Sequence, residues 1–188
     1  MDALDAIFTR QSIKNVRPDP VPRELIEKIL AAGAQAPNHH KVRPWRFVVL
    51  QGTARDALGE VMAQALARRN PAASSDSVIQ GIERAKPLRA PVVIAVGVDK
   101  ASGPKVVEFE NVCAAAAAAQ NMLLAAHALG LGGMWRSGDP IFDPAVREAL
   151  GFAADQQMVG FLYIGYPAVE MPPPTRPGAE DRTVWRGE

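Results

Sequence analysis

The sequence predicts one α+β or α/β domain, because segments with helical periodicity alternate with short apolar runs that are typical of strands. Its 188 residues suit a single domain, since domains hold roughly 100–200 residues, and a core of this size needs no disulfide or metal. Hydrophobic residues make up 48% and charged residues 22% of the chain, which is ordinary for a globular protein. We expect the domain to span residues 1–170 and the proline-rich remainder, residues 171–188, to form an arm.

The first part of the chain begins with a short helix at residues 2–8, capped by an aspartate and followed by the polar stretch 9–17. Pro22 opens the next helix, because the first helical position does not use the N–H that proline lacks. Apolar residues at helical spacing trace one face of that helix as far as Gly33. A loop then leads into residues 45–50, whose composition predicts a strand.

The middle of the chain alternates in the same way. We expect a helix at residues 54–69, a polar stretch, and a shorter helix at residues 78–85. Residues 91–98 are apolar and rich in β-branched side chains, which indicates a buried strand. Residues 106–129 hold six consecutive alanines and are apolar nearly all round, so we expect a central helix. Cys113 lies within that helix, and we expect its side chain to be buried.

The last part begins with a glycine-rich passage, residues 130–138, that leaves the long helix and is assigned no regular structure. Residues 143–150 predict a short helix and residues 158–165 a strand. The tail that follows is rich in proline and lacks periodicity, so we expect it to be disordered or an extended arm.

The overall charge and the start of the chain exclude several classes of function. A formal net charge of +1 argues against bulk electrostatic binding to nucleic acid or to an anionic membrane. The single cysteine allows neither an internal disulfide nor a cysteine zinc cluster. The chain starts with two aspartates among five residues instead of the basic and apolar start of a signal peptide, so we expect a cytoplasmic protein. Polar residues interrupt the alanine-rich segment, which argues against a membrane span.

Hydrolytic, metal and Rossmann signatures are not found in the sequence. No G-x-S-x-G elbow presents a nucleophilic serine to the three histidines, His39, His40 and His127. The two adjacent histidines match no metal-binding pattern, and no Walker A sequence occurs. The stretch 130–135 fails G-x-G-x-x-G, because Trp135 occupies the place of the third glycine. We therefore assign no catalytic residue and no metal site.

Two clusters of cations and hydroxyl groups remain. Arg10, Ser12 and Lys14 alternate, so in an extended segment all three side chains would point the same way, an arrangement that suits a phosphate. Arg136 and Ser137 follow a double glycine and offer the same chemistry, with backbone that a ligand can approach closely. The alternative for both clusters is a solvated basic surface. Two anion-binding stretches without hydrolytic residues indicate a phosphorylated cofactor that carries the chemistry itself.

Four stretches, in order along the chain, resemble motifs of the nitroreductase superfamily and of its small YdjA-like branch. The first two are R-Q-S-I-K at residues 10–14 and A-P-N-H-H-K-V-R-P-W-R-F at residues 36–47. The other two are G-G-M-W-R-S-G at residues 132–138 and G-F-L-Y-I-G-Y-P at residues 160–167. The similarity runs from the first residue to about residue 170.

The resemblance implies an α+β fold with a central, mostly antiparallel sheet flanked by helices. It further implies a homodimer with two FMN molecules at the subunit interface, an FMN-dependent oxidoreductase that passes hydride from NAD(P)H through flavin N5 to a small acceptor. The acceptor would be a nitroaromatic, a quinone or a similar small oxidised molecule. Because the flavin would carry the chemistry, the resemblance assigns no catalytic residue.

The resemblance also implies three groups of cofactor contacts. Arg10 and Ser12 would hold the phosphate, and Lys14 would approach the N1/C2 carbonyl edge, where a fixed cation stabilises the anionic reduced ring. Gln35 and His39 would reach the flavin that is bound mainly by the partner chain. Residues 135–137 form a second stretch of contacts, in which Arg136 is another phosphate ligand. The groups comprise Arg10, Gln11, Ser12 and Lys14; Gln35 and His39; and Trp135, Arg136 and Ser137.

Two departures from the family pattern leave other readings open. Gln11 stands where close relatives have a second arginine, and Arg43 replaces the glutamine of Q-P-W. A flavin-binding protein for storage or sensing, without turnover, is therefore one alternative. Another is a helical interaction module that binds no flavin and uses the alanine-rich helix as its assembly face. For the arm we expect no role beyond wrapping around a dimer.

Overall fold

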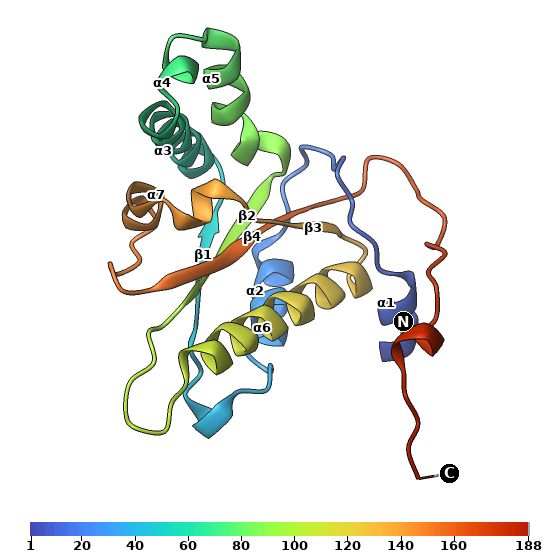
Figure 1. The fold of residues 1–188 in the computed structure, drawn as a ribbon. Helices are drawn as coiled ribbons and strands as arrows, with labels where there is room; N and C mark the ends of the chain where they lie inside the picture. Colours follow the sequence, from blue (N-terminus) through green and yellow to red (C-terminus); the bar gives the residue numbers. More distant parts are fainter. Residues whose placement is uncertain (188) are drawn as a thin grey trace.

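The structure is a computed structural model that describes residues 1–187. It contains one antiparallel sheet with helices on both faces (Figure 1). Glu188, the last residue of the predicted arm, lies outside the described residues. The α-helices are α1 Ala3–Thr9, α2 Arg23–Gly33, α3 Thr53–Arg69, α4 Pro71–Ser74, α5 Ser77–Arg84, α6 Glu108–Ala128 and α7 Pro144–Ala149. The 3-10 helices are η1 His39–Lys41, η2 Lys86–Arg89, η3 Asp139–Phe142 and η4 Glu180–Arg182. The strands are β1 Trp45–Leu50, β2 Val92–Val98, β3 Gly132–Arg136 and β4 Gln157–Gly165.

The four strands are ordered β1-β2-β4-β3, and each neighbouring pair is antiparallel. Helices α2 and α6 lie on one side of the sheet, while α3 and α7 lie on the other (Figure 1). This arrangement confirms the α+β fold and the mainly antiparallel sheet that the resemblance implied. None of the helices within residues 1–187 is long and apolar enough to cross a membrane.

Strand β2 supplies both hydrophobic cores, because all seven of its residues are buried. Val92, Ile94 and Val96 point into the core that contains α2 and α6. Val93 and Ala95 point the other way, into the core that contains residues of α3 and α7. The period of two in a strand explains why a continuous apolar run is needed where both faces of a sheet are covered.

The long helix α6 is buried on one side only. Its alanines pack closely against α2 and the sheet, and a Cβ added to Gly33 of α2 would lie 2.8 Å from Met122 Cγ. Cys113 is exposed, so the expectation of a buried thiol is wrong. The reason is helical phase: residues 114, 115, 118, 119 and 122 face the core, and position 113 falls beside Phe109, which is 73% exposed.

The glycine-rich passage after α6 forms strand β3, which the sequence pattern did not indicate because glycine is a poor strand former. Its glycines serve close packing. A Cβ on Gly132 would lie 2.9 Å from Ile13 Cβ, and a Cβ on Gly133 would lie 2.8 Å from Leu123 Cδ2. Side chains at these positions would separate β3 from the N-terminal segment and from α6.

The chain after β4 is extended and contains only the short helix η4 as regular structure among its described residues. It runs back beside α1, so η4 lies near the N-terminus (Figure 1). Gln11 Nε2 donates a hydrogen bond of 2.8 Å to the Pro172 carbonyl, which fastens the start of this arm to the N-terminal segment.

Candidate functional site

The segment that follows α1 runs along the edge of the sheet. Ser12 forms an isolated parallel bridge with Gly133 of β3, and the Ile13 N–H donates to the Gly133 carbonyl at 3.1 Å. Further along, the Arg17 N–H donates to the Tyr166 carbonyl at 2.7 Å. These backbone contacts place the side chains of residues 10–17 beside the ends of β3 and β4.

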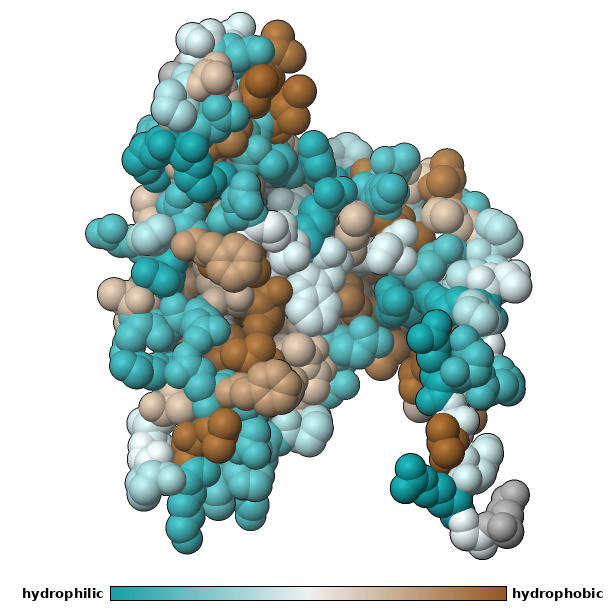
Figure 2. All heavy atoms as spheres, in the orientation of Figure 1, coloured by the Kyte–Doolittle hydropathy of each residue, from teal (hydrophilic) through white to brown (hydrophobic). Residues whose placement is uncertain are grey.

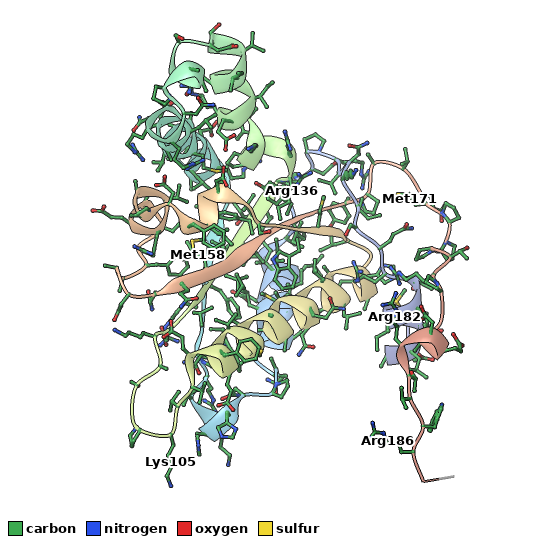
Figure 3. The ribbon with its side chains drawn as sticks, viewed as in Figure 1. Lys105, Arg136, Met158, Met171, Arg182 and Arg186 are labelled. Carbon is green, nitrogen blue, oxygen red and sulfur yellow. The ribbon has the colours of Figure 1, made fainter. Side chains whose placement is uncertain are left out.

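Lys14 lines a basic pocket of about 430 Å³ together with Arg89 and Arg136. Arg136 is the last residue of β3, and Figure 3 shows it near the N-terminal segment, far from the labelled arm residue Arg182. The other lining residues are Asn15 and Val16. The pocket therefore gathers cations from the N-terminal segment, from η2 and from β3, three stretches that are well separated in the sequence.

The three cations of the basic pocket have no carboxylate partner within 4.0 Å among residues 1–187. The Arg136 guanidinium lies over the Tyr163 ring, 5.5 Å from its centroid. Because like charges repel, a cluster of unpaired cations stabilises the fold less than paired ones would, and it favours binding of an anionic or electron-rich ligand.

A second hollow, of about 300 Å³, adjoins the basic pocket and shares Arg89 and Arg136 with it. Lys86, Ser137 and Tyr163 also line this hollow. Trp135 contributes to its wall, but its indole N–H is already used, since Nε1 donates to the Val159 carbonyl at 2.9 Å. A Cβ on Gly160 would lie 2.1 Å from that nitrogen, so Gly160 makes room for the indole.

Arg10 lies at the C-terminal end of α1, next to Arg176 of the arm rather than in the basic pocket. The Arg176 guanidinium donates to the carbonyl groups of Phe8, at 3.4 Å, and of Arg10. Burial and the positive charge of Arg176 both lower the pKa of Arg10. The two guanidinium groups thus lie within electrostatic reach of each other, and guanidinium groups offer several N–H donors to a tetrahedral anion.

His127 of α6 belongs to the same end of the site. Its Nε2 lies 2.7 Å from Thr9 Oγ1, and Thr9 donates its hydroxyl proton to the Asp5 carbonyl at 2.6 Å. His127 Nε2 is therefore the donor to Thr9. Burial and the nearby Arg10 lower the pKa of His127, which favours the neutral imidazole.

Gln35 and His39 do not line the basic pocket of their own chain. Gln35 lies at the end of α2 beside a hollow between α1, α2 and α6, and His39 is exposed on η1. The loop that carries His39 holds His40, Lys41 and Arg43 at positive φ angles of 49°, 56° and 51°. Non-glycine residues adopt this conformation at a cost, and such strain concentrates at functional loops.

The structure thus brings Lys14 and Arg136 together, with Trp135 and Ser137 in the adjoining hollow, while Arg10 lies with Arg176 at the other end of the segment. Ser12 is exposed between the two ends. Sequence reasoning did not identify the other basic residues at the site, and no motif marks them. Those residues are Lys86, Arg89 and Arg176.

The comparisons with known proteins agree on one family. The sequence model of the nitroreductase family matches residues 7–166. The chain is 37% identical over 182 residues to the Escherichia coli K12 protein named "Putative NAD(P)H nitroreductase YdjA", covering 93% of this chain and 97% of that protein.

Two solved structures show the same fold. One is a nitroreductase-like family protein from Bacillus cereus, with a TM-score of 0.84, 24% identity, and coverage of 99% of this chain and 96% of that one. The other, from Desulfovibrio desulfuricans, is described as "a putative nitroreductase in complex with fmn", with a TM-score of 0.73, 30% identity, and coverage of 100% and 98%. With the family match extending over most of its length, this chain belongs to the nitroreductase family.

Proposed function

We propose that this protein is an FMN-dependent oxidoreductase that uses NAD(P)H to reduce small oxidised acceptors such as nitroaromatics or quinones. The observation that carries the proposal is the basic pocket, where Lys14, Arg89 and Arg136 lie together without a carboxylate partner among the described residues. The name of the Escherichia coli relative and the FMN of the Desulfovibrio desulfuricans structure support it. When bound, FMN supplies the chemistry of accepting hydride from NAD(P)H and passing it on.

The residues present fit the phosphate end of FMN. Arg10 and Arg176 repel each other, and a phosphate placed between their guanidinium groups would turn that repulsion into two charge-assisted hydrogen bonds. The hydroxyl of Ser12 is exposed one alternation further along and can donate to the same ligand. The arm therefore has a proposed role in cofactor binding, which extends the wrapping role expected from the sequence.

The residues also fit the ring end. Lys14 lies four positions after Arg10, which in extended chain corresponds to about 13 Å. The two cationic groups can therefore hold opposite ends of one elongated ligand. Lys14 and Arg136 line one pocket, and we propose that both would stand beside the ring, where fixed cations stabilise the negative charge of the reduced form without reorganisation. This proposal moves Arg136 from the phosphate, which the resemblance implied as its ligand, to the ring end. Ser137 offers its backbone N–H at the adjoining hollow.

We further propose that the protein acts as a homodimer in which Gln35 and His39 reach the flavin of the partner subunit. Neither residue lines the basic pocket of its own chain: Gln35 lines a hollow beside α6, and His39 is exposed on η1. The exposed face of α6 includes Phe109 and Cys113, and Leu4 and other apolar residues of α1 are exposed as well. A partner that covered these surfaces would remove apolar area from water.

The purified protein tests this function directly. We expect a yellow preparation with flavin absorption bands that NADH or NADPH bleaches under anaerobic conditions, and that a nitroaromatic or a quinone restores. A colourless protein that takes up no added FMN would refute the proposal. Bound FMN that neither nicotinamide reduces would indicate storage or sensing instead. Sedimentation measurements give the oligomeric state, and a monomer that retains FMN would refute the shared site.

A further inference from the structure

Helix α5 is oriented unlike an ordinary amphipathic helix, because its apolar side chains are exposed and an acidic side chain is buried. Its apolar residues Val78, Ile79 and Ile82 are exposed, and Figure 2 shows brown, apolar side chains at the top of the molecule, where Figure 1 places α5. Among the eight residues of α5, all of which the structure describes, Glu83 alone is buried, at 5% exposure. A carboxylate is costly to bury, so this orientation of α5 calls for a reason other than core packing.

Glu83 is paired with Lys86, the first residue of η2, through its Oε2 atom. Its second carboxylate oxygen, Oε1, is buried and has no hydrogen-bond partner among residues 1–187. The Lys86 side chain is 35% exposed and lines the hollow of about 300 Å³ beside the basic pocket. The buried carboxylate thus holds an ammonium group at the wall of that hollow.

Tyr163 lines the same hollow, and nearby charged groups shift the pKa of its hydroxyl. The residue is only 6% exposed. Burial raises the pKa of Tyr163, Arg136 and Arg89 lower it, and Glu83 adds a smaller increase. Arg136, Arg89 and Glu83 therefore each lie within electrostatic reach of Tyr163.

The donor set of the hollow matches one part of FMN. The pyrimidine edge of the isoalloxazine presents two carbonyl oxygens, and carbonyl oxygens accept hydrogen bonds. Lys86, Arg89 and Arg136 carry only donors, and the latter two also line the Lys14 pocket. A ring whose N1/C2 side faces Lys14 would extend its remaining pyrimidine edge toward Lys86 and Arg89.

We propose that Lys86 and Arg89 contact the pyrimidine edge of the bound flavin, and that Glu83 is a positioning residue that holds Lys86 and partly neutralises its charge. This inference rests on the proposed function, because it requires FMN in the basic pocket. It assigns further cationic contacts to the ring beside Lys14, and it gives the buried orientation of Glu83 a functional reason.

The test measures the midpoint potential of the bound flavin by spectroelectrochemical titration, together with the dissociation constant of FMN. Lys86→Met should lower the potential, because it weakens binding of the reduced flavin about tenfold more than binding of the oxidised form, about 30 mV for a two-electron couple. Lys86→Arg should retain the wild-type potential. Glu83→Gln should raise it, because the amide oxygen can still accept from Lys86 while the negative charge is lost.

The matched control is Glu60→Gln. Glu60 of α3 pairs with Arg84, which lies next to Glu83 on α5; Arg84 Nε is 2.5 Å from Glu60 Oε2. This ion pair is half exposed, and neither residue lines the two hollows. Its removal should leave the potential unchanged. Circular dichroism of each variant establishes that it is folded.

Each outcome is decisive. Opposite shifts in Lys86→Met and Glu83→Gln support the proposal. Unchanged potentials in both variants, with FMN bound, would overturn it and leave the pair a structural one, and a lowered potential in Glu83→Gln would overturn the role assigned to that carboxylate. A wild-type protein that binds no FMN would instead refute the proposed function, so the two failures are distinguishable.

Discussion

Basic side chains occupy two contrasting environments in this protein. At the end of α3, Arg69 Nη1 lies 3.0 Å from Asp143 Oδ2, and Arg68 lies 3.6 Å from the other carboxylate oxygen. Asp143 is buried and also accepts hydrogen bonds from two N–H groups of the first turn of α7. In the basic pocket, by contrast, Lys14 and Arg136 have no carboxylate within ion-pair distance among residues 1–187.

The paired charges at Asp143 stabilise the fold, whereas the unpaired cations of the basic pocket are available to bind a ligand. The Arg69–Asp143 pair joins α3 to α7, so loss of Arg69 would leave the charge of a buried carboxylate balanced only by the more distant Arg68. The cations of the basic pocket form no ion pair within residues 1–187. Their repulsion opposes folding, and a site of this kind gains its stability when a negatively charged group binds.

The largest expected effect comes from breaking the paired environment. Asp143→Ala removes both the cap of α7 and the partner of Arg69, and it should lower the free energy of unfolding by about 3 kcal/mol. Urea denaturation of the apoprotein measures this loss. Asp139→Ala is the matched control, because Asp139 is exposed and lies 3.8 Å from Arg69, so its removal should cost less than about 0.5 kcal/mol. Equal losses in the two variants would contradict the contrast.

The next effect comes from the unpaired arginines at the phosphate end. Arg10→Ala and Arg176→Ala should each weaken FMN binding about tenfold, because each removes one charge-assisted hydrogen bond of about 1.5 kcal/mol. Quenching of flavin fluorescence on titration of the apoprotein measures the dissociation constant. Arg182→Ala is the control within the same arm, since the Arg182 side chain pairs with its neighbour Asp181 and with no other carboxylate among residues 1–187. A dissociation constant that Arg176→Ala leaves unchanged would place the phosphate elsewhere.

Most of the fold could be predicted because its elements have strong periodicity. The apolar run that became β2 and the alanine-rich helix α6 were placed to within about two residues, a precision limited by fraying of the helix ends. Strand β3 could not be predicted, because its first two residues are glycines that are selected for close contact with Ile13 and Leu123 rather than for strand propensity. The exposure of Cys113 depended on which face of α6 meets the sheet, which composition alone does not specify.

The candidate site was predictable only where residues form a local motif. The alternation at Arg10, Ser12 and Lys14 could be found because all three lie in one extended segment. Arg89 and Arg176 reach the same region from η2 and from the arm, through tertiary packing that no sequence spacing reveals. A buried carboxylate such as Glu83 is equally hidden, because the pattern of α5 predicts that its apolar face, not its acid, turns inward.

A smaller and more selective effect is expected at the ring end. Lys14→Met should lower the midpoint potential of the flavin, with the reduced form binding about tenfold more weakly relative to the oxidised form, since a fixed cation near the reduced ring is lost. The unfolding free energy of the apoprotein should not fall, because Lys14 has no ion pair to lose within the described residues. Lys28→Met, on the exposed side of α2, is the control. An unchanged potential would remove Lys14 from the ring.

The smallest effect concerns His127, whose pKa is lowered by burial and by Arg10. A phosphate bound at Arg10 would offset that positive charge, so FMN should raise the pKa of His127 toward its ordinary value of about 6.5. By linkage, FMN should then bind more tightly as the pH falls through the range below 6.5. In the apoprotein the sign is opposite: the unfolded chain takes up the proton first, so stability falls over the same range.

NMR titration of the imidazole, identified by its absence in His127→Gln, measures the pKa of His127 with and without FMN. Arg10→Gln provides the matched comparison, because it should raise this pKa in the apoprotein and leave FMN little further effect. The prediction separates two accounts of the unpaired charge at Arg10. If FMN leaves the pKa of His127 unchanged while still binding tightly, the phosphate does not neutralise Arg10, and the arginine pair belongs to the anchoring of the arm alone.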